Sequence, residues 1–220
     1  MKENITSEYW TRWRKINFEY FKKNLDEEPT GGQLVDLGSG TSPFAILKEK
    51  FSCLNVDFSP FEGVDLVADL DEPLPLKDDF YDIVFMSNIL EHLFFPERTL
   101  KESFRILKKG GKIFGTVPFF LSPHQEPYDF YRYTYLALER LLKEAGFREI
   151  DVEALGGGID ILKSISDFFF NLLIAGKTTG IQKVLARFLR KINKIFLPFF
   201  RNSFPATKNF ALGYGFKAIK

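Results

Sequence analysis

The sequence predicts an α/β fold: a Rossmann-like, doubly wound sheet that is mostly parallel, with an antiparallel last strand and a helical insertion before that strand. Short apolar runs alternate with amphipathic helical patterns along the first two thirds of the chain. Runs such as 33–37 and 81–87 are apolar on both faces, which is typical of parallel strands covered by helices on both sides. The 220 residues suffice for one α/β domain with an appendage.

Seven strands are predicted. Five of them lie in the first part of the chain, at residues 33–37, 53–58, 64–70, 81–87 and 111–118. Two more, at 148–155 and 211–220, form the antiparallel pair that closes such a sheet. Residues 1–155 together with 210–220 therefore form one domain, and residues 156–209 form an insertion.

Helical patterns separate the strands. A leading helix is predicted at 3–24, within the segment 1–28, and its apolar positions face the core: Tyr9, Trp13, Ile16 and Tyr20. Three more helices are predicted at 42–50, 96–110 and 134–147. The residues expected to mark their ends are Ser42 as a cap with Pro43 after it, Pro96 and Gly110, and Thr134 and Gly146.

Composition excludes several classes of protein. The single cysteine, Cys53, rules out an internal disulfide framework and a cysteine-rich zinc site, and we expect no metal. The polar N-terminus lacks the pattern of a secretory signal. The sequence contains no run of about 18 uncharged apolar residues, so we expect no membrane-spanning helix. We therefore expect a cytoplasmic protein.

Charge is divided unevenly along the chain. The net charge is +1, but residues 1–167 carry −9 and residues 168–220 carry +10 without a single acidic residue. Such an asymmetry points to an anionic partner for the basic region.

Polar residues follow the predicted strands at their carboxyl ends, where doubly wound sheets bind ligands. Asp36 ends the first strand and is followed by Gly38 and Gly40, and Asp57 ends the second. Asp69, Ser87 and Asn88 come at the ends of the third and fourth strands. An acidic residue about 20 positions after a glycine turn suits the two hydroxyls of a ribose.

The details of this turn favour S-adenosylmethionine over a dinucleotide. A dinucleotide site needs a third glycine three residues after the second, and Pro43 stands there. Three carboxylates around one pocket repel a pyrophosphate but attract a sulfonium cation that also carries an amino group.

Five segments carry a resemblance to a known family: VDLGSGTSP, NVDFSP, ADLDEPLPLKDDFYDIVFMSNILEHL, RILKKGGKIFGTVP and LLKEAGF. In this order they resemble the class I S-adenosylmethionine-dependent methyltransferases, in particular the small-molecule, methyltransferase type 11-like branch. The resemblance covers roughly residues 30–155 and the final ALGYGFKAIK. The chain departs from the pattern at Ser42, where a third glycine is common.

The resemblance implies a role for each matching position. Gly38 and Gly40 pass beneath the methionine part of the cofactor, and Asp36 holds its amino group. Asp57 binds both ribose hydroxyls. The remaining positions that the resemblance assigns to the cofactor are Asp69 and Leu70 at the adenine and Ser87 and Asn88 beside the methyl group.

The stretch VPFFLSPHQEPYDFYRYT, residues 117–134, combines ionisable and aromatic residues on the substrate side of the fold. An oxygen acceptor must lose a proton, and a group with a pKa near neutrality removes it most efficiently. His124 is the first candidate for this base and His92 the second. Four residues of the stretch are candidates for substrate binding: Tyr128, Asp129, Tyr131 and Arg132. The alternative is a structural loop in which Asp129 pairs with Arg132.

Within the insertion, residues 181–201 form a basic amphipathic helix, preceded by the apolar segment FFFNLLIAG. Three interpretations are open: a lid packed on the domain, a helix on an anionic membrane, or a nucleic-acid contact. The last is disfavoured because the aromatic residues do not interleave with the basic ones.

These observations predict an S-adenosylmethionine-dependent methyltransferase acting on a small or lipid-linked acceptor at oxygen, cytoplasmic and peripheral at the inner face of the membrane. The alternatives are a C-methyltransferase of a prenylated, quinone-type ring and a catalytically silent cofactor-binding subunit. A nicotinamide-dependent oxidoreductase is the alternative if the cofactor assignment fails.

Overall fold

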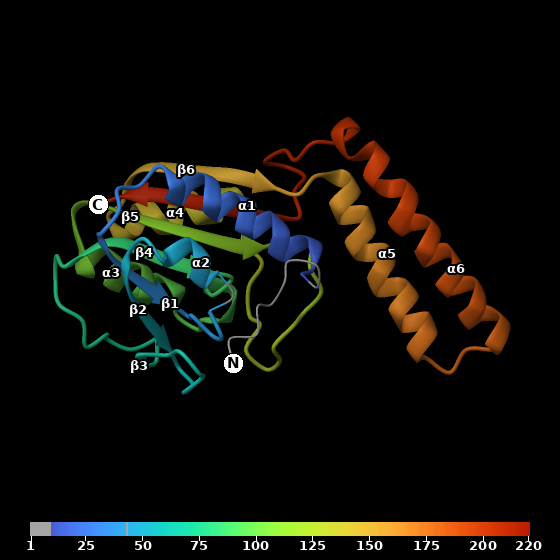
Figure 1. Cartoon of the computed structure of the whole chain (residues 1–220), viewed down its shortest axis with the longest axis horizontal. Helices are drawn as coiled ribbons and strands as arrows, with labels where there is room; N and C mark the ends of the chain where they lie inside the picture. Colours follow the sequence, from blue (N-terminus) through green and yellow to red (C-terminus); the bar gives the residue numbers. More distant parts are fainter. Residues whose placement is uncertain (1–9, 43) are drawn as a thin grey trace.

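The computed structural model describes residues 10–42 and 44–220. Its seven strands are β1 (Gln33–Leu37), β2 (Ser52–Asp57), β3 (Leu66–Val67), β4 (Tyr81–Ser87), β5 (Leu107–Pro118), β6 (Arg148–Leu155) and β7 (Gly213–Ile219). They form one sheet in the order β3-β2-β1-β4-β5-β7-β6, drawn in Figure 1. The pairs among β1 to β5 are parallel, and β7 runs antiparallel to both β5 and β6. The predicted fold class is confirmed.

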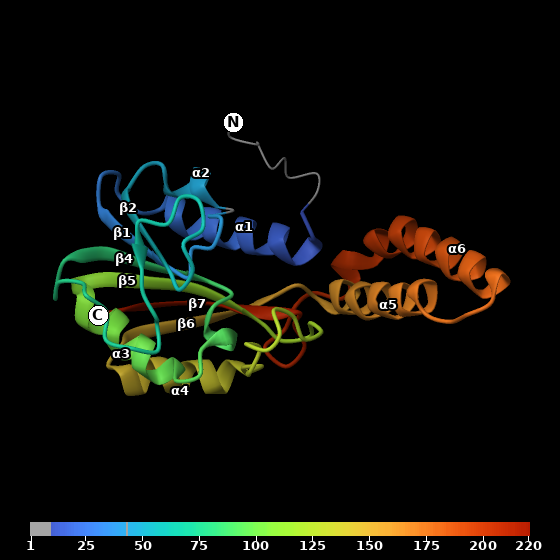
Figure 2. The same ribbon diagram turned by 90° about the horizontal axis from the view of Figure 1, so that it is seen from below.

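Helices cover both faces of this sheet. The first four are α1 (Arg12–Asp26), α2 (Ala45–Lys48), α3 (Pro96–Ile106) and α4 (Tyr135–Ala145). Figure 2 shows α1 and α2 on one side of the sheet and α3 and α4 on the other. Thr134 caps α4 through its side chain, and Gly146 ends it in the left-handed conformation, as predicted.

Alternation along each strand divides the core into two layers. In β1, Leu34 contributes to the layer beneath α1 while Val35 contributes to the layer beneath α3 and α4. In β4, Phe85 and Met86 divide in the same way. Because successive side chains point to opposite faces of a strand, strands that are apolar throughout are buried on both sides.

Three predicted elements have wrong boundaries: the helix at 96–110, the strand after it and the strand at 64–70. The helix expected at 96–110 ends at Ile106, and β5 begins at Leu107, four residues before the predicted strand. Pairing of Leu107 with Tyr81 of β4 draws this segment into the sheet. The strand expected at 64–70 pairs only at Leu66–Val67, where it lies at the edge of the sheet.

The helix after β1 also differs from the prediction. It begins at Ala45, with Phe44 at the N-cap and no side-chain cap, so Ser42 does not cap it. The Ser42 hydroxyl instead accepts a hydrogen bond of 2.7 Å from Lys48 Nζ. The expected role of Pro43 lies outside the described residues, as does the part of the leading helix that includes Tyr9. In the described part that helix begins after its cap, Thr11.

The insertion forms a helical hairpin of α5 (Gly158–Ala175) and α6 (Gly180–Phe196), followed by the 3-10 segment η3 (Leu197–Ser203). The hairpin projects away from the sheet, as Figure 1 shows. Buried Asp160 fixes its base, because its Oδ1 accepts from Arg12 Nε of α1 at 2.9 Å and from Arg201 Nε of η3 at 3.2 Å. Within residues 10–42 and 44–220, no helix is long and apolar enough to span a bilayer.

Candidate active site

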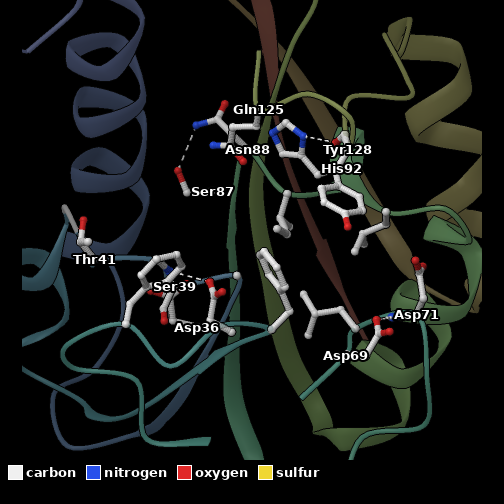
Figure 3. A pocket seen from close by; sticks show the side chains of 18 of the residues that line it. Asp36, Ser39, Thr41, Asp69, Asp71, Ser87, Asn88, His92, Gln125 and Tyr128 are labelled. Carbon is white, nitrogen blue, oxygen red and sulfur yellow. Dashed lines mark hydrogen bonds between the residues drawn. The ribbon is translucent and has the colours of Figure 1, made fainter. Parts of the chain in front are cut away.

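A cavity of about 850 Å³ opens beyond the carboxyl ends of β1, β2 and β4 (Figure 3). All eight residues predicted to bind the cofactor line it: Asp36, Gly38, Gly40, Asp57, Asp69, Leu70, Ser87 and Asn88. The topology explains this convergence, since the carboxyl ends of parallel neighbouring strands meet at one end of the sheet.

The turn after β1 is held by the backbone of β2. The amides of Gly38 and Ser39 both donate to the Val56 carbonyl, at 2.9 and 3.0 Å. Gly38 has φ 78°, and a Cβ there would lie 2.5 Å from the Ile89 side chain, so only glycine fits. Gly40 has φ 50° and borders open space, because a Cβ there would meet nothing within 4 Å. The turn therefore leaves room for a ligand beside its backbone.

Ser42 occupies the position where the family pattern has a third glycine. Its φ of 51° lies in the left-handed region that glycine favours, so the departure in sequence does not change the shape of the turn. The hydrogen bond from Lys48 to its hydroxyl, and one of 2.7 Å from its amide to the Ser39 carbonyl, hold this conformation.

Asp57 is buried and oriented by the backbone. Its Oδ2 accepts from the Gly40 amide at 2.8 Å and its Oδ1 from the Ser59 amide at 3.1 Å. A carboxylate has about four acceptor positions, so each oxygen keeps one for a ligand. The residue thus joins the glycine turn to the cavity and presents two fixed acceptors there.

Asp36 is paired with a lysine that the sequence analysis did not identify. Lys48 is almost fully buried and donates to Asp36 Oδ2, while its ammonium also donates to Asn55 Oδ1 at 3.1 Å. Asp36 Oδ1 is buried and has no hydrogen-bond partner among the described residues. Burial raises the pKa of Asp36, and the Lys48 ammonium opposes that shift. One oxygen of this cavity-lining carboxylate thus has no partner in the described part of the chain.

Aromatic residues also line the cavity. Phe58 and Phe61 follow β2 and are 64% and 44% exposed, and buried Leu70 lines the same cavity. Exposed Asp69 accepts from the amide of Asp71, whose own carboxylate binds the backbone after the 3-10 segment η2 (Leu90–His92). Neither phenylalanine was predicted to line the site, although Phe58 is the last residue of the predicted second strand and Phe61 follows it.

Asn88 connects the cavity to the leading helix. Its Oδ1 accepts from Trp13 Nε1 at 2.8 Å, and its Nδ2 donates to Ser87 Oγ at 3.2 Å. Its φ of 54° is one that asparagine tolerates better than most residues. Helix α1 therefore supports the site directly, in addition to covering the sheet.

The loop between β5 and α4 divides into a part that lines the cavity and a part that braces the loop. Tyr128 lines the cavity with Gln125 and Glu126, while Asp129, Tyr131 and Arg132 do not. Arg132 binds both carboxylate oxygens of Asp129, at 2.6 and 2.8 Å, and holds the pKa of Asp129 at about 2. This is the paired arrangement that the sequence analysis left open as the structural alternative.

Tyr131 also braces this loop, because its hydroxyl donates to the Phe94 carbonyl at 3.2 Å. The roles of Asp129, Tyr131 and Arg132 in substrate binding remain predictions, with all three side chains engaged in protein contacts.

The two histidines lie together although 32 positions separate them. Their rings are 4.9 Å apart and nearly perpendicular, and only His92 lines the cavity. His92 Nδ1 contacts the Tyr128 carbonyl at 2.6 Å, drawn as a dashed line in Figure 3. Burial lowers the pKa of His92, and burial raises the pKa of neighbouring Glu91 to about 8. His92 is thus better placed than His124 to meet an acceptor in the cavity.

Sequence comparison places the chain among known proteins. A family model described as "Methyltransferase domain" matches residues 9–152. An uncharacterized protein of Methanocaldococcus jannaschii is 29% identical over 107 residues, which are 45% of this chain and 49% of that protein. A demethylmenaquinone methyltransferase of Corynebacterium kroppenstedtii is 29% identical over 193 residues, covering 70% of this chain and 82% of the enzyme. The chain thus spans about half the length of the Methanocaldococcus protein that it matches.

Solved structures share the fold. A methyltransferase from Archaeoglobus fulgidus described as SAM-dependent superposes with a TM-score of 0.62 at 19% identity, covering 94% of each chain. A phosphoethanolamine N-methyltransferase of Haemonchus contortus in complex with S-adenosyl-L-methionine superposes with a TM-score of 0.59 at 18% identity, over 93% of this chain and 52% of that one. Because the family model covers well over half of the chain, the chain belongs to the methyltransferase-domain family, the S-adenosylmethionine-dependent methyltransferases of class I.

Proposed function

We propose that this enzyme transfers the methyl group of S-adenosylmethionine to an oxygen of a lipid-linked acceptor. In this proposal the two free acceptor positions of Asp57 bind the ribose hydroxyls, and Asp36 Oδ1 accepts from the amino group of the cofactor. Gly40 leaves the space that the methionine part occupies. The adenine lies between Leu70 and the phenylalanines after β2, with Asp69 at its amino group.

The position of His92 is the observation that supports oxygen as the atom that accepts the methyl group. It lines the cavity on the side of the loop that follows β5, and its Nδ1 is engaged with a carbonyl while Nε2 has no partner among the described residues. A neutral imidazole in this state can accept a proton from a hydroxyl. The pKa of His92 is lowered by burial, so the ring is neutral and competent at neutral pH.

A carbon acceptor on a quinone-type ring is the second candidate. It is favoured by the names of relatives such as the Corynebacterium enzyme, which is called a demethylmenaquinone methyltransferase. The two candidates differ in the bond that forms, and hydriodic acid distinguishes them. Methyl groups on ether oxygen leave as iodomethane, whereas methyl groups on carbon stay in the product.

The test supplies the purified enzyme with methyl-labelled cofactor and a membrane lipid extract. We expect label in the lipid fraction that hydriodic acid releases as volatile iodomethane. Label that resists the acid would support the carbon alternative. Binding of the cofactor by calorimetry with no label in any acceptor would favour the catalytically silent subunit.

The acceptor is proposed to be lipid-linked because of the helical hairpin. β6 runs parallel to β5, so the hairpin leaves the sheet at the same end as the cavity. Exposed apolar side chains line both helices and η3, each at least 50% exposed: Leu162, Ile165, Phe168, Phe169, Leu172, Ile181, Val184, Leu185, Phe188, Ile195, Phe196, Phe199 and Phe200. We call this set the apolar face.

On α6 the apolar face lies away from the contact with α5. Arg190 of α6 donates to Asn171 of α5 at 2.7 Å, and Arg190 lies on the side of α6 opposite the apolar side chains. Such a broad apolar surface on a projecting element marks an interaction site rather than a core. The apolar face is therefore not packed on the domain as the lid interpretation requires.

The remaining surface of α6 is basic, and nothing acidic lies between residue 168 and the end of the chain. Near an anionic bilayer each Lys or Arg contributes about 1 kcal/mol, falling with salt. We therefore propose that the hairpin inserts its apolar face into the interface of an anionic membrane, on the cytoplasmic side.

Vesicle sedimentation tests this proposal. At low salt the protein should sediment with anionic vesicles and remain in solution with neutral ones. Changing Phe169 and Phe188 to Ser should abolish binding, since each loses a large apolar side chain that is more than half exposed. The matched control is Phe120→Ser, an exposed phenylalanine outside the hairpin. Equal binding by the hairpin variant and wild type would refute a membrane role for this face.

A further inference from the structure

Three side chains from two segments gather beside the cofactor cavity. They are Glu91 and His92 of η2 and His124 of the loop after β5. One potential ligand atom from each lies within 4.8 Å of the other two. We call these residues the histidine cluster. His92 also lines the cavity, so the cluster adjoins the place where the cofactor and acceptor meet.

Three buried polar atoms of the histidine cluster have no hydrogen-bond partner among the described residues. Glu91 is fully buried, and neither of its carboxylate oxygens has a hydrogen-bond partner in the described part of the chain. His92 Nε2 is buried and likewise unpartnered there. Burying three acceptors without a partner is costly, and a cation among them removes the cost.

The second observation concerns the other nitrogen of each ring. His92 Nδ1 contacts the Tyr128 carbonyl at 2.6 Å. His124 Nδ1 lies 3.3 Å from the Ser122 carbonyl and 3.4 Å from the Asp129 carboxylate. A histidine that binds a metal almost always donates its second N–H to a carbonyl or carboxylate in this way, which fixes the ring and presents Nε2 to the ion.

The distance between two of the ligand atoms fits coordination to a shared metal ion better than it fits a hydrogen bond. Glu91 Oε1 and His92 Nε2 are 3.7 Å apart, which is too long for a hydrogen bond. Two ligands at about 2.0–2.1 Å from one tetrahedral zinc ion are separated by about 3.3 Å. The 3.7 Å between Glu91 and His92 is close to this value, and the ligand atom of His124 lies within 4.8 Å of both.

We propose that Glu91, His92 and His124 bind one divalent transition-metal ion such as Zn²⁺. Imidazole nitrogens select this class over Mg²⁺ and Ca²⁺, which prefer oxygen ligands. The expectation of no metal rested on the single cysteine, and two imidazoles with one carboxylate need no cysteine.

Three protein ligands leave a coordination position, and a hydroxyl of the acceptor fills it. In this role His92 is a metal ligand rather than the base, so the bound hydroxyl loses its proton to solvent water. The oxygen then attacks the methyl carbon, and the electrons of the carbon–sulfur bond remain on sulfur as a neutral thioether. This catalytic role rests on the proposed oxygen acceptor, whereas metal binding itself does not.

The test titrates Co²⁺ into the full chain after treatment with a chelator, followed by visible absorption, and repeats the titration with Zn²⁺ by calorimetry. We expect one equivalent per chain and the absorption of four-coordinate Co²⁺. His124→Asn, at a half-exposed position that tolerates substitution, should weaken Zn²⁺ binding by at least tenfold, and Glu91→Gln should do the same. Glu97→Gln, an exposed change on α3 outside the cluster and the cavity lining, should leave binding unchanged.

The proposal is overturned if the wild-type chain takes up no stoichiometric metal, or if His124→Asn binds Zn²⁺ as tightly as the wild type. The proposed function is tested separately in the same preparations. If the chain transfers methyl groups but binds no metal, the proposed function holds and the metal proposal is refuted. Equal rates with and without bound metal would overturn the catalytic role.

Discussion

Asp57→Ala should weaken binding of S-adenosylmethionine by roughly a hundredfold or more. The two carboxylate oxygens of Asp57 are each fixed by one backbone amide, which leaves one acceptor position on each for the ribose diol. A hydrogen bond to a charged group contributes about 1.5–3 kcal/mol, so losing two costs at least about 3 kcal/mol. At about 1.4 kcal/mol for each factor of ten, this exceeds a hundredfold.

Titration calorimetry measures the effect, and two further variants make it specific. Asp57→Asn keeps the shape and one acceptor oxygen but loses the charge, so its affinity should fall between those of Asp57→Ala and the wild type. Glu62→Gln removes a charge from the same loop without touching the cavity lining and should bind as the wild type does. A folded Asp57→Ala protein with wild-type affinity would refute the assignment of the ribose to this carboxylate.

Two further predictions concern stability. Lys48→Met leaves the buried Asp36 carboxylate without its cation and should lower the free energy of unfolding, measured with urea, by about 3–5 kcal/mol. Adding Asp36→Asn should recover part of this loss. A Lys48→Met protein as stable as the wild type would contradict the pairing. Hydrogen bonds from Arg105 lower the pKa of Glu102, so the ionised carboxylate stabilises the fold above its unfolded pKa and ceases to do so as the pH falls through the folded value. Glu102→Gln should therefore destabilise by about 1 kcal/mol at pH 7 and by less at pH 3, and a pH-independent difference would rule this out.

The fold was predictable where local signals agree with one another. The predicted bounds 33–37, 81–87 and 148–155 coincide with those of β1, β4 and β6. Helix α4 has a capping threonine and a terminal glycine at its two ends, and both act as predicted. In these elements the local signals agree: the period of apolar residues indicates each strand or helix, and in α4 the capping residue and the terminal glycine indicate the same bounds. Tertiary contacts therefore do not change the structure that these signals predict.

Prediction failed where pairing across the sheet decides the structure. Lys108 and Lys109 are good helix formers, yet they lie in β5. The partners responsible are distant in sequence, since Leu107 pairs with Tyr81 and the Lys220 amide donates to the Gly111 carbonyl. No pattern within the segment itself reports such a contact.

The candidate site shows the same division. The convergence of the eight predicted cofactor residues on the cavity was predictable, because the carboxyl ends of parallel strands must meet. Which of them are engaged with one another was not. The buried partner of Asp36 is a lysine from a helix of four residues, and lysine is almost never fully buried without a partner, so composition gives no sign of it. In the loop after β5, the spacing of Asp129 and Arg132 permitted either pairing or substrate binding.

The hairpin shows how far an amphipathic pattern alone can be used. The pattern separates an apolar and a basic side of α6, and the usual expectation is that the apolar side is buried. The contact with α5 instead uses a third side, where Ala186 is the only buried residue of α6 and Lys183 and Asn193 are half-buried. A small residue at the crossing lets the helices approach without burying larger side chains. The apolar residues of α6 therefore remain exposed after the hairpin has formed, and this exposure follows from the assembled structure and not from the helical pattern alone.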